Sequence, residues 1–121
     1  MRKPTPPTTT ITLDADGKVL GRFASLVAYT LLGKGTPSYR PDVISGEKVI
    51  ITNASKIRVT GTKLLTKKYA HFSGYPGGLR ETILRDKLAQ DPTSVLITAI
   101  KRMLPQNRTR KFILKRLVVK A

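Results

Sequence analysis

The first third of the chain constrains the fold most, because a strand pattern there is followed directly by a helix pattern. Residues 9–13 alternate between polar and apolar side chains, which predicts a first strand. After a turn at Asp16-Gly17, apolar residues recur at helical spacing: Leu20, Phe23 or Ala24, Val27 and Leu31. We expect Asp16 to cap a helix that begins near Lys18, and Gly33 to end it in the left-handed conformation. Strand, turn and helix in this order form the first half of a βαβ unit.

The middle of the chain predicts two further strands and a short helix. Residues 33–46 are punctuated by glycine and proline and predict a loop. Residues 48–52 form an apolar, β-branched run that is typical of a strand covered on both faces. Residues 56–60 alternate basic with β-branched side chains, which favours a more exposed strand. Residues 61–67 are expected to form a short helix.

Two more helices and a last strand are predicted in the second half. Thr82 is expected to cap a helix whose apolar residues include Leu84 and Leu88. Asp91 followed by Pro92 is a good helix start, because a proline at the first helical position loses no hydrogen bond. The apolar stripe that follows ends at Leu104-Pro105, and residues 117–119 read as a strand.

Length and composition indicate one globular domain. A chain of 121 residues with 40% hydrophobic residues can bury a core. Residues 1–10 are polar and contain three prolines, so we expect a flexible or extended arm there and a single domain over residues 11–121. The arm lacks the apolar region of a secretory signal, no apolar run reaches the length of a membrane helix, and cysteine is absent. These features favour a cytoplasmic protein without a disulfide scaffold.

The charge is strongly positive and unevenly distributed. Lys and Arg number 23 against 7 Asp and Glu, a formal net charge of +16. No acid lies between Glu47 and Glu81, and none follows Asp91. An ordinary soluble surface mixes both signs, so this pattern indicates a polyanionic partner. Nucleic acid is the first candidate and an anionic membrane surface the second.

Residues 71–80 form the most suggestive loop in the basic region. They contain the only histidine of the chain, His71, and three of its nine glycines. Glycine lets a backbone approach a phosphate chain closely, although Gly77-Gly78 could equally serve a tight turn. Of the aromatic residues, we expect Phe23 and Phe112 in the core. We expect Tyr39 and Tyr75 to stack on unpaired bases.

Enzymatic motifs are missing. His71 is the only possible histidine base, the acids are dispersed, and no metal-ligand spacing occurs. The glycines at 17, 21, 33 and 35 match neither the dinucleotide fingerprint nor the phosphate-binding loop. We therefore expect no enzyme, no cofactor, no metal and no small-molecule substrate. The signatures of the common sequence-reading modules are also missing, which favours recognition of folded RNA by backbone and shape.

Several motifs in order resemble one family. Ser73-Gly74-Tyr75-Pro76-Gly77-Gly78-Leu79 looks like the signature loop of the bacterial-type ribosomal protein L13 (uL13) family of the large subunit. Residues 14–22, Val49 to Lys56 with Asn53-Ala54, and Met103-Leu104-Pro105 with the basic residues up to Leu117 resemble further segments of that family. The similarity covers nearly all of residues 11–119.

The resemblance implies a three-layer α/β/α fold with a small, mainly parallel four-stranded sheet. It implies a structural protein that binds large-subunit rRNA, lies beside other ribosomal proteins and acts early in subunit assembly. A membrane and a homo-oligomer are not expected. Charge and resemblance together predict these rRNA contacts: Arg22, Lys34, Tyr39, Arg40, Lys63, Lys67, Lys68, His71, Ser73, Gly74, Tyr75, Gly77, Gly78, Arg80, Lys101, Arg102, Arg108, Arg110, Lys111, Lys115 and Arg116.

Two other functions remain open from the sequence. One is a free RNA-binding regulator or ribosome assembly factor that does not stay in the subunit. The other is a small phosphate- or nucleotide-using enzyme built on the opening strand and helix.

Overall fold

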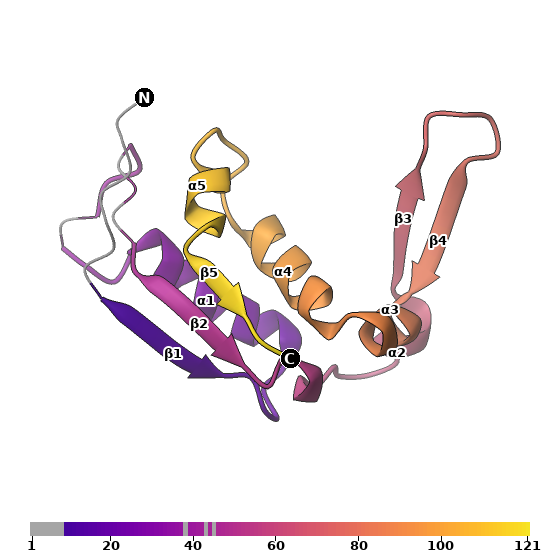
Figure 1. Cartoon of the computed structure of the whole chain (residues 1–121), viewed down its shortest axis with the longest axis horizontal. Coiled ribbons are helices and arrows are strands. Elements are labelled where there is room, and N and C mark those ends of the chain that lie inside the picture. The colour runs from indigo at the N-terminus through magenta and orange to yellow at the C-terminus, as the bar shows by residue number, and fades with distance from the viewer. Residues whose placement is uncertain (1–8, 38, 43, 45) are drawn as a thin grey trace.

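Three parallel strands form the main sheet. The computed structural model describes residues 9–37, 39–42, 44 and 46–121, and the sheet contains β1 (Thr10–Asp14), β2 (Lys48–Thr52) and β5 (Leu117–Val119). Their order is β1-β2-β5, so β2 is central and pairs with a parallel neighbour on each side (Figure 1). The strands expected at residues 9–13, 48–52 and 117–119 are thus confirmed.

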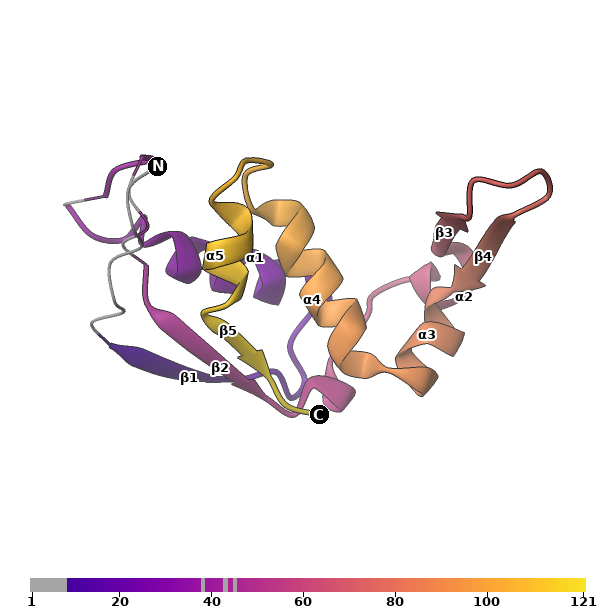
Figure 2. The same ribbon diagram turned by 45° about the horizontal axis from the view of Figure 1, so that its top comes forward.

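The helices lie over one face of this sheet. Helices α1 (Leu20–Leu32), α4 (Pro92–Met103) and α5 (Arg110–Leu114) are on the same side of the strands (Figure 2). Val49 and Ile51 of β2 point into this side and are fully buried, whereas Ile50 between them is only half-buried. We call the sheet with these three helices the body. The core residues of the body are Leu20, Phe23, Ala24, Val27, Leu31, Val49, Ile51, Val95, Leu96, Ile100 and Ile113.

Local signals explain one end of α1 and the start of α4. Gly33 ends α1 with φ 75°, and its N–H donates to the Thr30 carbonyl at 3.1 Å, as predicted. Asp91 caps α4 by accepting a hydrogen bond from the Ser94 N–H at 3.3 Å, and Pro92 is the first helical residue. The prediction that Asp16 caps α1 is wrong. The residue before the helix is Val19, and no side chain caps it.

The prediction of a strand at residues 56–60 is also wrong. The chain forms a short 3₁₀ turn at Ala54–Lys56, after Asn53 in the left-handed conformation, and then makes one isolated bridge from Arg58 to Val19. The Leu20 N–H donates to the Arg58 carbonyl at 2.9 Å, but α1 begins at this residue. The single bridge between Val19 and Arg58 therefore cannot extend into a pair of strands, because the chain becomes helical directly after Val19.

The α/β class with a parallel sheet is confirmed, with differences in strand number and layering. The parallel sheet has three strands where four were expected, because residues 56–60 do not join it. Since α1, α4 and α5 share one face, the described residues form two layers where three were expected (Figure 2). The exposed side chains of Thr10 and Thr12 lie on β1, an edge strand of the sheet.

A β-hairpin projects from the end of the body that is distant from the sheet (Figure 1). Its strands are β3 (Lys68–Phe72) and β4 (Leu79–Ile83), which pair antiparallel. Helices α2 (Lys63–Thr66) and α3 (Leu84–Gln90) flank its base, and α2 confirms the short helix expected at residues 61–67. Thr82 does not cap a helix as predicted. It pairs with Tyr69 across the hairpin, and the helix begins two residues later.

Candidate nucleic-acid interface

The tip of the hairpin is a tight glycine turn. The Gly78 N–H donates to the Tyr75 carbonyl at 2.9 Å, and the Ser73 N–H donates to the Gly78 carbonyl at 3.3 Å. Gly74 and Gly77 have φ of 90° and 73°, which other residues adopt at a cost. At Gly78 a Cβ atom would overlap the Ser73 hydroxyl and lie 2.9 Å from the Tyr75 carbonyl oxygen. The glycines are therefore required by the turn itself, which holds Tyr75 out into solvent.

Apolar and basic side chains surround this tip. Tyr75 is 76% exposed, Phe72 61% and Leu79 59%, and Phe72 and Leu79 are cross-strand partners. The next pair down the hairpin is His71 and Arg80, both exposed. Exposed aromatic rings beside cations are the combination that stacks on unpaired bases and holds their phosphates. Leu79 was not among the predicted contacts, because the sequence alone does not show whether a leucine is buried or exposed.

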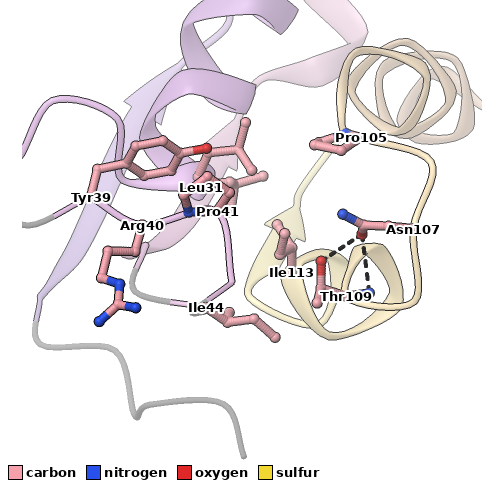
Figure 3. A pocket seen from close by; sticks show the side chains of 10 residues that line it. Leu31, Tyr39, Arg40, Pro41, Ile44, Pro105, Asn107, Thr109 and Ile113 are labelled. Carbon is pink, nitrogen blue, oxygen red and sulfur yellow. Dashed lines mark hydrogen bonds between the residues drawn. The ribbon is translucent and has the colours of Figure 1, made fainter. Parts of the chain in front are cut away.

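A second group of predicted contacts meets at the opposite end of the molecule. Tyr39, from the loop after α1, faces Asn107 and Thr109, from the segment before α5, across a hollow of about 130 Å³ (Figure 3). Arg40 also lines this hollow, with its guanidinium turned away from Asn107 and Thr109. Asn107 Oδ1 accepts hydrogen bonds from the N–H and the hydroxyl of Thr109, and these bonds fix the two residues on their side of the hollow. The loop after α1 and the segment before α5, both of which contain predicted rRNA contacts, are thus neighbours in space. The tip of the hairpin, residues 73–78, is remote from them (Figure 1), whereas His71 lower on the hairpin lines a hollow that Arg102 of α4 also lines.

Arg116 has a different environment from the other predicted contacts. Its side chain is buried, with 7% relative exposure. The guanidinium donates hydrogen bonds to the carbonyls of Gly46 and Ile44, and burial lowers its pKa. Gly46 in turn packs so closely on the Leu31 carbonyl that a Cβ atom would overlap it. Arg116 therefore fastens the loop before β2 to the body, and the prediction of an rRNA contact is weakest at this residue.

The remaining predicted cations are accessible. Arg110 is half-buried, and the exposed ones are Arg22, Lys34, Arg40, Lys63, Lys67, Lys68, Arg80, Lys101, Arg102, Arg108, Lys111 and Lys115. Few of them face a carboxylate. Arg40 pairs with Asp42 at 3.2 Å and Lys68 with Glu81 at 3.6 Å, both on the surface. Surface pairs of this kind contribute little energy, so most of the positive charge is available to a polyanion.

Two of the acids, Asp14 and Asp91, stabilise local structure through hydrogen bonds. Asp14 Oδ1 accepts hydrogen bonds from the Asn53 side chain at 3.0 Å and from the Asp16 N–H at 2.9 Å, and these bonds lower its pKa. The pKa of Asp91 is lowered in the same way by Thr93 and Ser94 at the start of α4. Within the described part of the chain, no group of three or more His, Asp and Glu side chains could hold a metal ion. Among the same residues, no helix has the length and apolar character needed to cross a membrane.

Comparison with known proteins shows to which family the chain belongs. Residues 8–120 match the family model described as Ribosomal protein L13. The chain belongs to the ribosomal protein L13 family. The large ribosomal subunit protein uL13 of Aquifex aeolicus is 53% identical over 107 residues, which are 88% of this chain and 74% of the relative. The uL13 of Thermotoga maritima is 49% identical over 109 residues, or 90% of this chain and 73% of the relative.

Membership of the L13 family confirms the resemblance seen in the motifs. It also confirms that the chain is not an enzyme, since the relatives are ribosomal structural proteins. A third relative, the uL13 of Oleidesulfovibrio alaskensis, is 48% identical over 109 residues, covering 90% of this chain and 76% of its own length. The individual rRNA contacts stay predictions, supported by exposure and charge.

Proposed function

We propose that this protein is a structural component of the large ribosomal subunit that binds large-subunit rRNA. The observation that carries the proposal is the set of exposed cations that, among the described residues, form no ion pair with a carboxylate; they occur on both the body and the hairpin of an L13 family member. A folded protein gains little from crowding like charges on its own surface. An RNA backbone neutralises them and releases condensed counterions.

The two groups of contacts have different roles in the proposal. On the body, phosphates are held by Arg40, which lines the hollow of Figure 3, and by Arg108 and Lys111, which are close in sequence to its lining residues Asn107 and Thr109. On the hairpin, the glycine turn brings backbone and Tyr75 against the RNA. Because the two groups lie at opposite ends of the molecule, one copy of the protein bridges separate RNA segments (Figure 1). Bridging of this kind supports an early role in subunit assembly.

The rest of the proposal concerns how the protein is organised and what surrounds it. We propose that residues 11–121 act as one unit, although β1 already begins at Thr10 within the ten-residue arm that we expected. Residues 1–8 of the arm lie outside the described residues. The partners are rRNA and neighbouring large-subunit proteins, and the net charge of +16 opposes self-association.

Binding to a large-subunit rRNA transcript as a function of salt tests the RNA contacts. We expect affinity to fall steeply with salt, with a slope near −0.9 per phosphate contacted in a duplex, as roughly estimated from counterion release. The Arg108→Gln/Lys111→Gln double variant should weaken binding by about tenfold or more and flatten the slope. The matched control is Lys56→Gln/Arg58→Gln, which removes the same charge from exposed positions outside the predicted contacts. Equal losses in the two double variants would show that only net charge matters.

Sucrose-gradient fractionation of cell extracts separates the proposal from its alternative. A structural component sediments with the large subunit and with whole ribosomes. A free regulator or transient assembly factor occurs in the light fractions or only with immature subunits, and that result would overturn the proposed function.

A further inference from the structure

Three cations surround one tyrosine ring where the hairpin joins the body. The nitrogen Nζ of Lys87 lies 4.3 Å from the centre of the Tyr69 ring, Nζ of Lys67 lies 5.6 Å away, and the Arg102 guanidinium carbon lies 5.7 Å away. They come from three separate segments: Lys87 from α3, Arg102 from α4 and Lys67 from the residue that precedes β3. Tyr69 is half-buried against the core, and burial raises the pKa of its phenol.

The ring attracts each cation but does not neutralise any of them. Aromatic faces hold ammonium and guanidinium groups through their quadrupole, and the like charges still repel one another. The arrangement gathers positive charge into a small volume around a neutral group. An anion placed among the three side chains removes this repulsion.

A hollow is present beside the cluster. It measures about 380 Å³ and lies between β3 of the hairpin and helices α3 and α4, with Tyr69, Lys87 and Arg102 on its walls. The hydroxyl-bearing residues Thr82 and Thr98 also line it, as does Ser94, whose hydroxyl already donates to the Asp91 carbonyl at 3.0 Å. Ammonium, guanidinium and hydroxyl groups are the donors that bind phosphate oxygens.

We propose that this hollow binds a phosphate group of the RNA chain, held by Lys87 and Arg102 beside the ring of Tyr69. The inference rests on the proposed function, since it names an RNA contact at a place where neither Tyr69 nor Lys87 was predicted. The occupied site ties the hairpin to α3 and α4 through one shared anion. It thereby fixes the direction in which the hairpin carries its glycine turn.

The neighbouring surface favours an RNA chain over an isolated anion. Arg102 also lines a second hollow of about 190 Å³ along α4, together with Lys63 and Lys67. Positive charge thus continues from one hollow into the next, as a polymer with a charge on every repeat requires. One carboxylate, Asp91, lines the first hollow, but its Oδ1 accepts hydrogen bonds from Thr93 and Ser94 at 2.6 and 3.3 Å. The phosphate therefore lies toward Arg102, away from Asp91.

The first test compares two double variants that remove equal charge. Lys87→Gln/Arg102→Gln empties the hollow of its cations, whereas Arg85→Gln/Arg58→Gln removes two exposed cations elsewhere, one of them on the same helix α3. With a large-subunit rRNA transcript, we expect the first to lose about tenfold or more in affinity and to lower the salt slope by about one. The second should lose less than about threefold. Equal losses would overturn this inference alone, whereas failure of the unaltered protein to bind the transcript would overturn the proposed function as well.

A second variant should change affinity in the opposite direction. Asp91→Asn removes the negative charge from the hollow, and asparagine caps a helix about as well as aspartate. We expect rRNA to bind about two- to threefold more tightly, since one repulsive charge near the phosphate is lost. Asp86→Asn makes the same change in α3 outside the hollow and should have a smaller effect. A gain no larger for Asp91→Asn than for Asp86→Asn contradicts a phosphate in this hollow.

The ring and the source of the phosphate are tested separately. Tyr69→Phe keeps the ring and should bind rRNA as the unaltered protein does, whereas Tyr69→Leu should bind more weakly once circular dichroism shows that it is folded. Inorganic phosphate at millimolar concentration is the probe for a free anion. We expect it to raise the melting temperature equally in the unaltered protein and in Lys87→Gln/Arg102→Gln. Selective stabilisation of the unaltered protein, with equal rRNA binding by both, would assign the hollow to a free anion and overturn the RNA contact.

Discussion

Leu96 in α4 has no exposed side-chain area, whereas Tyr75 at the tip of the hairpin is 76% exposed. The two regions differ in the same direction. The body packs a continuous apolar core between one face of the sheet and its helices, although Leu26 and Tyr29 of α1 are exposed, while Phe72, Tyr75 and Leu79 of the hairpin region lie in solvent. A two-stranded hairpin is only marginally stable alone, so this one depends on Tyr69 and Leu84 at its base. The body therefore supplies stability, and the hairpin is free to present groups to a partner.

The largest expected effect separates the regions by stability. Leu96→Ala should lower the free energy of unfolding by about 3 kcal/mol, because it leaves a cavity in a fully packed core. Ile97→Ala on the same helix is the control. Ile97 is 38% exposed, so we expect a loss below about 1 kcal/mol. Urea denaturation followed by circular dichroism measures both. Similar losses would mean that the body is not packed as described.

Substitution of Arg116 tests whether this buried cation stabilises the folded body. Arg116→Met should destabilise the fold by about 2 kcal/mol, because the carbonyls of Gly46 and Ile44 lose a charged donor. Lys115→Met, at the exposed neighbouring position, should leave stability within about 0.5 kcal/mol. The same denaturation experiment distinguishes them. If Arg116→Met is as stable as Lys115→Met, the guanidinium does not fasten the loop.

The hairpin should show the reverse behaviour. Gly77→Val forces a β-branched residue to adopt φ 73° and should deform the turn, weakening rRNA binding by about tenfold. The unfolding free energy of the body should change by less than about 1 kcal/mol, since residues 73–77 of the turn are exposed. Filter binding and thermal melting measure the two quantities. Pro76→Ala, in the same turn, is the control. Unaltered affinity for Gly77→Val would exclude the turn as an RNA contact.

The smallest expected effect is a pH dependence that originates in the body. Hydrogen bonds from Asn53 and Asp16 lower the pKa of Asp14 below its ordinary value of 3.8. A carboxylate with a depressed folded-state pKa stabilises the protein above pH 3.8, and this contribution is lost as the pH falls through the folded value. Melting temperatures of the unaltered protein and Asp14→Asn, measured from about pH 6 to 2.5, should converge at the acid end. A difference that is constant over this range would show that the carboxylate charge has no role.

Local signals predicted the body well. Gly33 and Asp91 act on their own helix ends, so their neighbours in sequence are sufficient to interpret them. The strand predicted at residues 56–60 does not form, because a strand also needs a strand to pair with. The start of α1 at Leu20 removes that pairing partner. The hairpin was missed because its glycine-rich tip and basic strands resemble a loop when pairing is not visible. The turn of residues 73–78 becomes recognisable only once Phe72 and Leu79 are seen to be partners.

The site residues were likewise predicted where local sequence features suffice and missed where contacts between distant segments decide. Charge excess identified the accessible cations as a class, because charged side chains are rarely buried without compensation. It did not distinguish Arg116, whose burial depends on two carbonyls that are seventy or more residues away along the chain. Lys87 was not singled out, since its contact with Tyr69 arises from packing of α3 against the hairpin. Family membership supports the overall reading of the surface without ranking its individual residues.

The order β1-β2-β5 has a consequence for how the chain matures during its own synthesis. Translation releases β1, α1 and β2 first, so the central strand initially has one neighbour and an unpaired edge. Its second neighbour is made only when residues 117–119 appear, after both helices α3 and α4 and the complete hairpin. The hairpin region is thus synthesised before the sheet can close. An RNA that binds the hairpin early could engage the protein while its body is still incomplete.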